Sequence, residues 1–69
     1  MVRMKLHLLL SERKMTQQEL AYATGIRAST LSNYYNDSYK HLVKEHIDLI
    51  CSFFDCEITD LIEYRKNPD

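Results

Sequence analysis

Apolar residues recur at helical spacing at both ends of the chain. Near the N-terminus, Leu6, Leu9 and Leu10 follow the i, i+3, i+4 pattern that places apolar side chains on one face of a helix. This pattern predicts a helix over about residues 4–14. The same spacing after residue 43 predicts a fourth helix and a short fifth one. Their apolar positions are Ile47, Ile50, Phe53 and Phe54, then Ile58, Leu61 and Ile62, separated by Asp55-Cys56-Glu57.

The start of the second helix is marked by a capping signal. Thr16 is a favourable N-cap residue, and Glu19 follows it at the spacing of a capping box. Met15 before the cap and Leu20 after it are placed to form a hydrophobic staple. These features predict a helix over residues 17–24.

A glycine separates the second helix from a third. Gly25 lies where the second helix must end, and we expect a positive φ there because glycine adopts it at little cost. A third helix is predicted over residues 28–35, followed by a loop that begins with the turn sequence Asn36-Asp37-Ser38 and runs to His41. The small and apolar positions that these two helices can bury against each other are Leu20, Ala21, Ile26 and Leu31.

Together these segments predict one all-α domain of five short helices around a single core, with no strand pattern anywhere. A chain of 69 residues forms one small domain. The residues before the last three helices, Arg27, Val43 and Glu57, are poor N-caps, so those helix starts are expected only to within a residue or two. The tail around Pro68 is expected to fray.

Two short helices joined at a glycine, with polar residues outward on the second, are the layout of a helix-turn-helix. The sequence resembles the Cro and lambda-repressor-like (XRE) helix-turn-helix family, particularly its small single-domain members. The resemblance covers about residues 4–64 and includes the segment His46–Tyr64. It rests on Gln17, Leu20-Ala21, Gly25-Ile26, Thr30-Leu31-Ser32 and Asn36. It implies a DNA-binding domain over residues 1–69, a motif at about 16–36, and a bacterial, phage or mobile-element origin.

The resemblance also implies which residues meet double-stranded DNA. Residues at the start of the recognition helix would face base edges, with Arg27 suited to guanine and Asn33 to adenine. The full set expected at the bases is Arg27, Ala28, Ser29, Thr30 and Asn33. The alternatives are a solvated turn charge for Arg27, an exposed helix residue for Asn33 and a space-filling role for Thr30.

Phosphate contacts are expected on both sides of the groove. They are Arg13, Gln17, Asn36, Ser38 and Lys40. Three tyrosines lie close to this region, and we expect Tyr35 to pack in the core while Tyr34 or Tyr39 offers its hydroxyl to a phosphate.

Charge is distributed unevenly along the chain. The formal net charge is −1, but residues 1–44 carry seven Lys or Arg against three Asp or Glu, whereas residues 45–69 carry two against seven. A basic first half suits a duplex bound on one side only, although small domains also vary in charge by chance.

The acidic, apolar-rich C-terminal helices, about residues 44–64, are the expected surface for a homodimer. Its candidate residues are Phe53, Ile62 and Tyr64, with Ile58 expected in the monomer core instead. A dimer would place two recognition helices in successive major grooves about 34 Å apart.

Other chemistry is not expected from this sequence. Cys51 and Cys56 are interpreted as small core residues, with a thiol sensor as the alternative. Glu45 and His46 are interpreted as part of a solvated helix face. We therefore expect no enzyme, metal or cofactor. Because no signal peptide or membrane span is evident, we expect a cytoplasmic protein.

Two functions follow from these observations. The first is a transcriptional regulator, expected to be a repressor that occupies a palindromic operator as a dimer. The alternative is a protein-binding module, such as an antitoxin or a partner-dependent regulator. A transcriptional regulator could also bind a protein antirepressor or a toxin partner.

Overall fold

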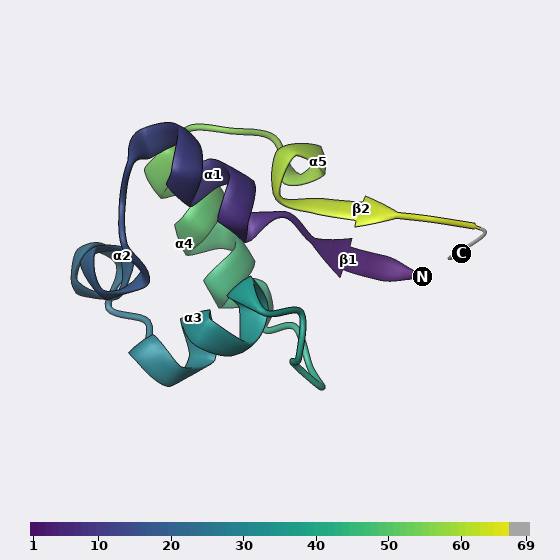
Figure 1. The fold of residues 1–69 in the computed structure, drawn as a ribbon, viewed down its shortest axis with the longest axis horizontal. Coiled ribbons are helices and arrows are strands. Elements are labelled where there is room, and N and C mark those ends of the chain that lie inside the picture. Colours follow the sequence, from purple (N-terminus) through teal and green to yellow (C-terminus); the bar gives the residue numbers. More distant parts are fainter. Residues whose placement is uncertain (67–69) are drawn as a thin grey trace.

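The computed structural model describes residues 1–66. Five helices surround one core, as predicted, and a two-stranded sheet projects from one end of the helical body (Figure 1). The second and third helices have the predicted bounds, whereas the first begins at Leu6 and the fifth ends at Leu61. In chain order the elements are β1 (Val2–Met4), α1 (Leu6–Arg13), α2 (Gln17–Thr24), α3 (Ala28–Tyr35), α4 (Lys44–Phe54), α5 (Ile58–Leu61) and β2 (Ile62–Tyr64).

The core collects one or two side chains from each helix. Leu6, Leu20, Leu31 and Ile50 are fully buried and come from α1, α2, α3 and α4 respectively. These side chains meet at a shared centre, although other large apolar residues of the same helices, such as Leu8 and Leu49, remain exposed. The remaining buried residues are Met4, Leu10, Ile26, Tyr34, Phe54 and Leu61.

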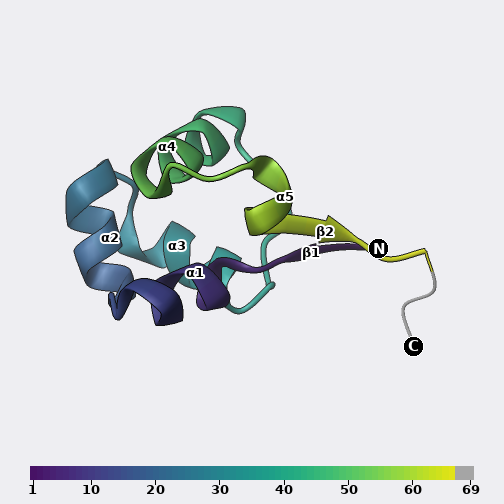
Figure 2. The same ribbon diagram turned by 90° about the horizontal axis from the view of Figure 1, so that it is seen from above.

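The sheet corrects the expectation of an all-α fold without strands. β1 and β2 pair antiparallel, with Arg3 opposite Glu63 and Met4 opposite Ile62. Each strand has three residues, too few for a period of two to be visible in the sequence, and the two strands come from opposite ends of the chain. The ribbon lies at the end of the molecule opposite α2 (Figure 2).

Local hydrogen bonds explain where the helices begin and end. The Glu19 N–H donates to Thr16 Oγ1 (3.1 Å) and the Thr16 N–H donates to Glu19 Oε1 (2.8 Å), which confirms the capping box. Gly25 follows α2 with φ +79°, as predicted. At the start of α5, the Asp60 carboxylate accepts a hydrogen bond from the Glu57 N–H (3.1 Å), so the weak N-cap residue is supported from within the helix.

The two cysteines are free, half-buried and packed against the core, as predicted. Burial, followed by the neighbouring Cys51 and nearby carboxylates, raises the pKa of the Cys56 thiol to about 11. The tail around Pro68 lies outside the described residues. Within residues 1–66, no helix is long and apolar enough to span a bilayer.

Candidate nucleic-acid interface

The turn between α2 and α3 is held by hydrogen bonds and by one buried side chain. Thr24 Oγ1 donates to the Leu20 carbonyl (2.8 Å) and accepts a hydrogen bond from the Ile26 N–H (3.3 Å). Gly25, between them, takes the left-handed conformation, and Ile26 is buried. The direction in which α3 leaves the turn is therefore set by backbone geometry on one side and by core packing on the other.

Helix α3 separates its residues into an inner and an outer face. Leu31 and Tyr34 are buried, whereas Arg27, Ser29 and Asn33 are exposed. Of the other predicted base-contacting residues, Ala28 is exposed and Thr30 is half-buried. The first turn of α3 thus presents polar side chains and one methyl group to solvent.

Arg27 occupies the N-cap position of α3 with an extended backbone (φ −60°, ψ 140°). Its carbonyl accepts the first helical hydrogen bond, from the Leu31 N–H (3.1 Å), but its side chain does not cap the helix. Neither of the ion pairs found within residues 1–66 involves Arg27. Its guanidinium is therefore available to a ligand outside the chain.

The predicted phosphate-contacting residues fall into separate groups. Asn36 ends α3, and Ser38 and Lys40 follow it in the same loop. The Ser38 hydroxyl donates weakly to the side-chain oxygen of Asn33 (3.4 Å), so the loop contacts the outer face of α3. Gln17 opens α2, where the N–H groups of Gln17 and Gln18 have no partner within the helix, whereas that of Glu19 donates to Thr16 Oγ1.

Arg13 lies apart from these residues and is already engaged. Its Nη2 donates to the Phe54 carbonyl (2.8 Å), and its guanidinium carbon lies 5.3 Å from the centre of the Phe54 ring. This contact joins the end of α1 to the end of α4. A phosphate bound by Arg13 would have to use the donors that remain.

The core tyrosine is Tyr34, so the expectation for Tyr35 was wrong. Tyr34 is 1% exposed and Tyr35 is 38% exposed. Both residues lie one turn from Leu31, but only Tyr34 has a hydrogen-bond partner for its hydroxyl, His46 Nδ1 at 2.8 Å. His46 is accordingly half-buried rather than on a solvated face. The two residues are twelve positions apart and on different helices, so the sequence carries no signal for this pair.

The predicted dimer residues lie on two elements. Phe53 is exposed on α4, while Ile62 and Tyr64 belong to β2, where Tyr64 is 71% exposed. Ile58 is 55% exposed, so its predicted place in the core was wrong. Helix α5 is only one turn long, and its Leu61 fills the core in place of Ile58.

Two comparisons with known proteins found sequences similar to this chain. The sequence pattern of the Cro/C1-type HTH DNA-binding domain matches residues 5–67. The chain is also similar to the HTH-type transcriptional regulator YozG of Bacillus subtilis (strain 168), a protein that is itself uncharacterized. The two are 33% identical over 61 residues, which cover 88% of this chain and 73% of YozG.

Proposed function

Because the chain belongs to the Cro/C1-type helix-turn-helix DNA-binding family, we propose that α2 and α3 are its helix-turn-helix and that α3 enters the major groove of a specific DNA site. We further propose that the protein regulates transcription, the role for which its relative YozG is named. The observation that carries the proposal is the outer face of α3, where exposed polar residues lie opposite the buried Leu31 and Tyr34.

Base recognition follows from the donors and acceptors on that face. Arg27 can donate two hydrogen bonds to guanine O6 and N7, and Asn33 can pair with adenine N6 and N7. Ala28 offers a methyl group to thymine, and Ser29 can bond to several bases. Thr30, which is half-buried, is placed to reach a base or a phosphate only at the edge of the interface.

Phosphate contacts would set the position of α3 in the groove. We assign this role to Gln17 at the start of α2 and to Asn36, Ser38 and Lys40 after α3, with a smaller share for Arg13 because Phe54 already binds its guanidinium. Residues 20–44 contain three Lys or Arg and a single acid, Asp37. This segment therefore favours a polyanion.

The ribbon suggests how two copies associate. Met1 and Arg65 exchange hydrogen bonds through both their backbone groups. Because such pairs alternate in an antiparallel ladder, the N–H and C=O of Tyr64 point away from β1. A second copy can pair with this edge by the same two groups, which would turn two ribbons into a four-stranded sheet.

Charge complementarity favours this pairing about a two-fold axis at Tyr64. With Tyr64 opposite Tyr64 of the second copy, Glu63 lies opposite Arg65 of that copy, twice in the dimer. Glu63 and Arg65 also form an ion pair within each chain (Oε2 to Nε, 3.3 Å), so the paired strands would bring four such charges together. Opposite charges facing each other across antiparallel strands are stabilising. Of the predicted dimer residues, Ile62 and Tyr64 would then lie at the interface and Phe53 would lie beside it or outside. Bound at a palindromic operator, such a dimer would repress by blocking polymerase.

A selection experiment tests the proposed function. The purified protein is incubated with a randomised duplex library at near-physiological salt, and the bound sequences are read. We expect a two-fold symmetric site with half-sites about one helical turn apart. Recovery of no sequence beyond background, with only weak salt-sensitive binding, would instead favour an antitoxin or another partner-dependent regulator.

The dimer has its own test in a pair of variants at one position. Tyr64→Pro removes an N–H that β1 does not use, so it should abolish pairing between copies and leave the ribbon within each copy. Tyr64→Ala keeps the N–H and serves as the control. In sedimentation at tens of micromolar, we expect a monomer for the proline variant and a dimer for wild type and control. A monomeric wild type would contradict the proposed dimer.

A further inference from the structure

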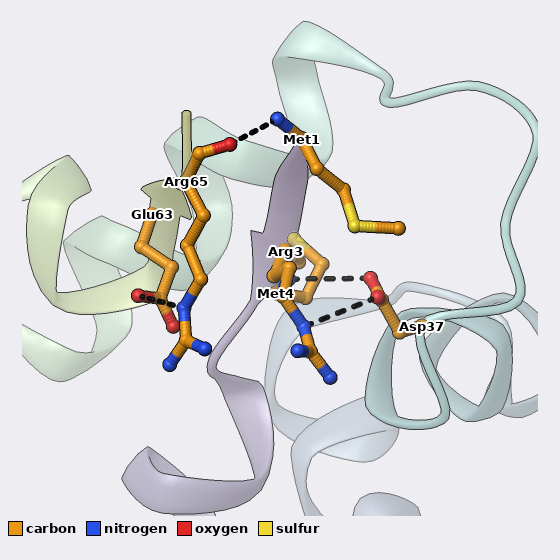
Figure 3. Close-up of polar contacts among 6 residues, drawn as sticks. All are labelled: Met1, Arg3, Met4, Asp37, Glu63 and Arg65. Atoms are coloured by element: carbon orange, nitrogen blue, oxygen red, sulfur yellow. Dashed lines mark hydrogen bonds and ion pairs between the residues drawn. The ribbon is translucent and has the colours of Figure 1, made fainter. Parts of the chain in front are cut away.

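Asp37 is the one acidic residue in the otherwise basic segment 20–44, and its carboxylate is bound to strand β1. Oδ1 accepts a hydrogen bond from the Met4 N–H (3.3 Å), and Oδ2 lies 4.0 Å from Arg3 Nε (Figure 3). The two contacts connect the loop after α3 with a strand more than thirty residues earlier in the chain. The sequence predicted only that Asp37 lies in the turn after the third helix.

The contact with Met4 satisfies a backbone group that the sheet leaves free. Met4 lies opposite Ile62 in a pair that makes no ladder hydrogen bonds, so its N–H points away from β2. The Met4 side chain is buried in the core, which holds its backbone in place. Asp37 is therefore bound to a rigid point of the body and not to a mobile strand end.

The backbone of Asp37 adopts the left-handed conformation. Its φ is +58°, a conformation in which glycine is least strained and aspartate is tolerated. The Asp37 N–H donates to the Tyr34 carbonyl (3.2 Å), and the Ser38 N–H donates to the Asn33 carbonyl (2.8 Å). Glycine would suit this turn better, but it would lack the carboxylate that reaches Met4 and Arg3.

A third group approaches the same carboxylate from within the loop. The pKa of the Tyr39 hydroxyl is raised by burial and then by the nearby Asp37 carboxylate. The Tyr39 ring packs edge-on against the buried Tyr34, with their centres 5.8 Å apart. Asp37 thus lies between β1 and the aromatic residues beneath the loop.

The loop held in this way carries the proposed phosphate contacts Asn36, Ser38 and Lys40. We propose that Asp37 is a positioning residue for DNA binding, which keeps this loop in its binding conformation through its contacts with β1. The inference rests on the proposed function. The positioning role predicts that loss of the Asp37 carboxylate weakens DNA binding. Electrostatics alone predicts the opposite, because removal of a negative charge beside DNA strengthens binding.

The test compares Asp37→Gly with Asp37→Asn. Glycine accepts the positive φ but has no carboxylate, while asparagine retains both the tolerance of φ and one oxygen acceptor for Met4. We expect Asp37→Gly to weaken binding to the selected site about tenfold and to make the salt dependence shallower as phosphate contacts are lost. Asp37→Asn should restore binding to within about threefold of wild type.

Asp55→Gly is the matched control, because Asp55 also has a positive φ (+53°) but lies at the end of α4. It should leave binding unchanged or slightly tighter. Equal or tighter binding by Asp37→Gly, or an equal loss in the Asp55 variant, would overturn the proposal.

Amide exchange in the free protein separates this inference from the proposed function. Asp37→Gly should speed exchange at Met4 and shift the resonances of residues 36–40, and Asp55→Gly should do neither. Unchanged exchange at Met4 would overturn the role of the contact. Failure of the wild-type protein to select any DNA would overturn both the proposed function and the positioning role, even if the exchange at Met4 responds as expected.

Discussion

The turn between α2 and α3 and the ribbon of β1 and β2 are stabilised in opposite ways. Around the turn, the bonds are local, from the capping box at Thr16 to the Thr24 hydroxyl, and the side chains of Leu20, Ile26 and Leu31 are buried beneath it. The ribbon instead pairs residues from opposite ends of the chain, and one of its edges faces solvent. The first region suits a rigid reading surface and the second suits association.

Asp37 lies where these two regions meet. It belongs to the loop that follows α3, and it binds Met4 and Arg3 of the ribbon. If copies pair through β2, the ribbon is also the element nearest the second subunit. Self-association and the contacts with phosphate would then depend on neighbouring parts of the structure.

The largest effect is expected where a substitution opens a cavity in the core beneath α3. Leu31→Ala removes a fully buried side chain from α3 and should lower the free energy of unfolding by about 2–5 kcal/mol. Val2→Ala, at an exposed position in β1, should change it by less than about 0.5 kcal/mol. Urea unfolding measures both. Similar losses in the two variants would show that the ribbon is as integral to the core as α3.

A smaller loss is expected at the turn itself. Gly25 has φ +79°, and a Cβ added there would meet no atom within 4 Å. Gly25→Ala should therefore cost only the backbone strain of the left-handed conformation, about 1–2 kcal/mol. Thermal unfolding monitored by circular dichroism provides the measurement. A negligible change would mean that the turn relaxes to another conformation.

The outer end of the ribbon should open locally while the helices remain folded. Backbone amides of Val2 and Tyr64 are expected to exchange faster than those of α2 and α3, because both side chains are exposed and oppose little opening, whereas Met4 is anchored by its buried side chain. Hydrogen exchange followed by NMR tests this at concentrations where the protein is monomeric. At higher concentrations, pairing through β2 should slow exchange at Tyr64 most. Protection of the ribbon equal to that of α3 at all concentrations would contradict the comparison.

A further prediction concerns the reactivity of the Cys56 thiol, which lies between α4 and α5, and involves no change in the fold. Since the pKa of Cys56 is raised from 9.0 to about 11, its thiolate fraction at pH 8 should be about 100-fold lower than that of an ordinary thiol. Alkylation by iodoacetamide should be correspondingly slow and should accelerate as the pH rises towards 11. Rapid modification at pH 8, located by mass spectrometry, would show that this region opens.

The region around the α2–α3 turn could be predicted from the sequence, whereas the ribbon could not. The bounds of α2 and α3 could be derived because the Thr16 cap and Gly25 act on their immediate neighbours. The ribbon could not, because three-residue strands carry almost no periodicity and their pairing depends on the rest of the fold. Within the site, the choice of Tyr34 over Tyr35 depended on a hydroxyl partner, His46, that the sequence alone does not place.

The central claim is that α3 reads base edges, and the affinity of Arg27→Ala tests it most directly. Binding of wild type and variant is measured on the selected site and on an unrelated duplex, with Lys40→Ala as a phosphate-contact control. We expect Arg27→Ala to lose about 1–3 kcal/mol of binding free energy on the selected site, with relaxed preference at one base pair and little change on the unrelated duplex. Lys40→Ala should weaken both complexes alike. An equal loss on both duplexes for Arg27→Ala would make Arg27 a phosphate contact and contradict base reading at the start of α3.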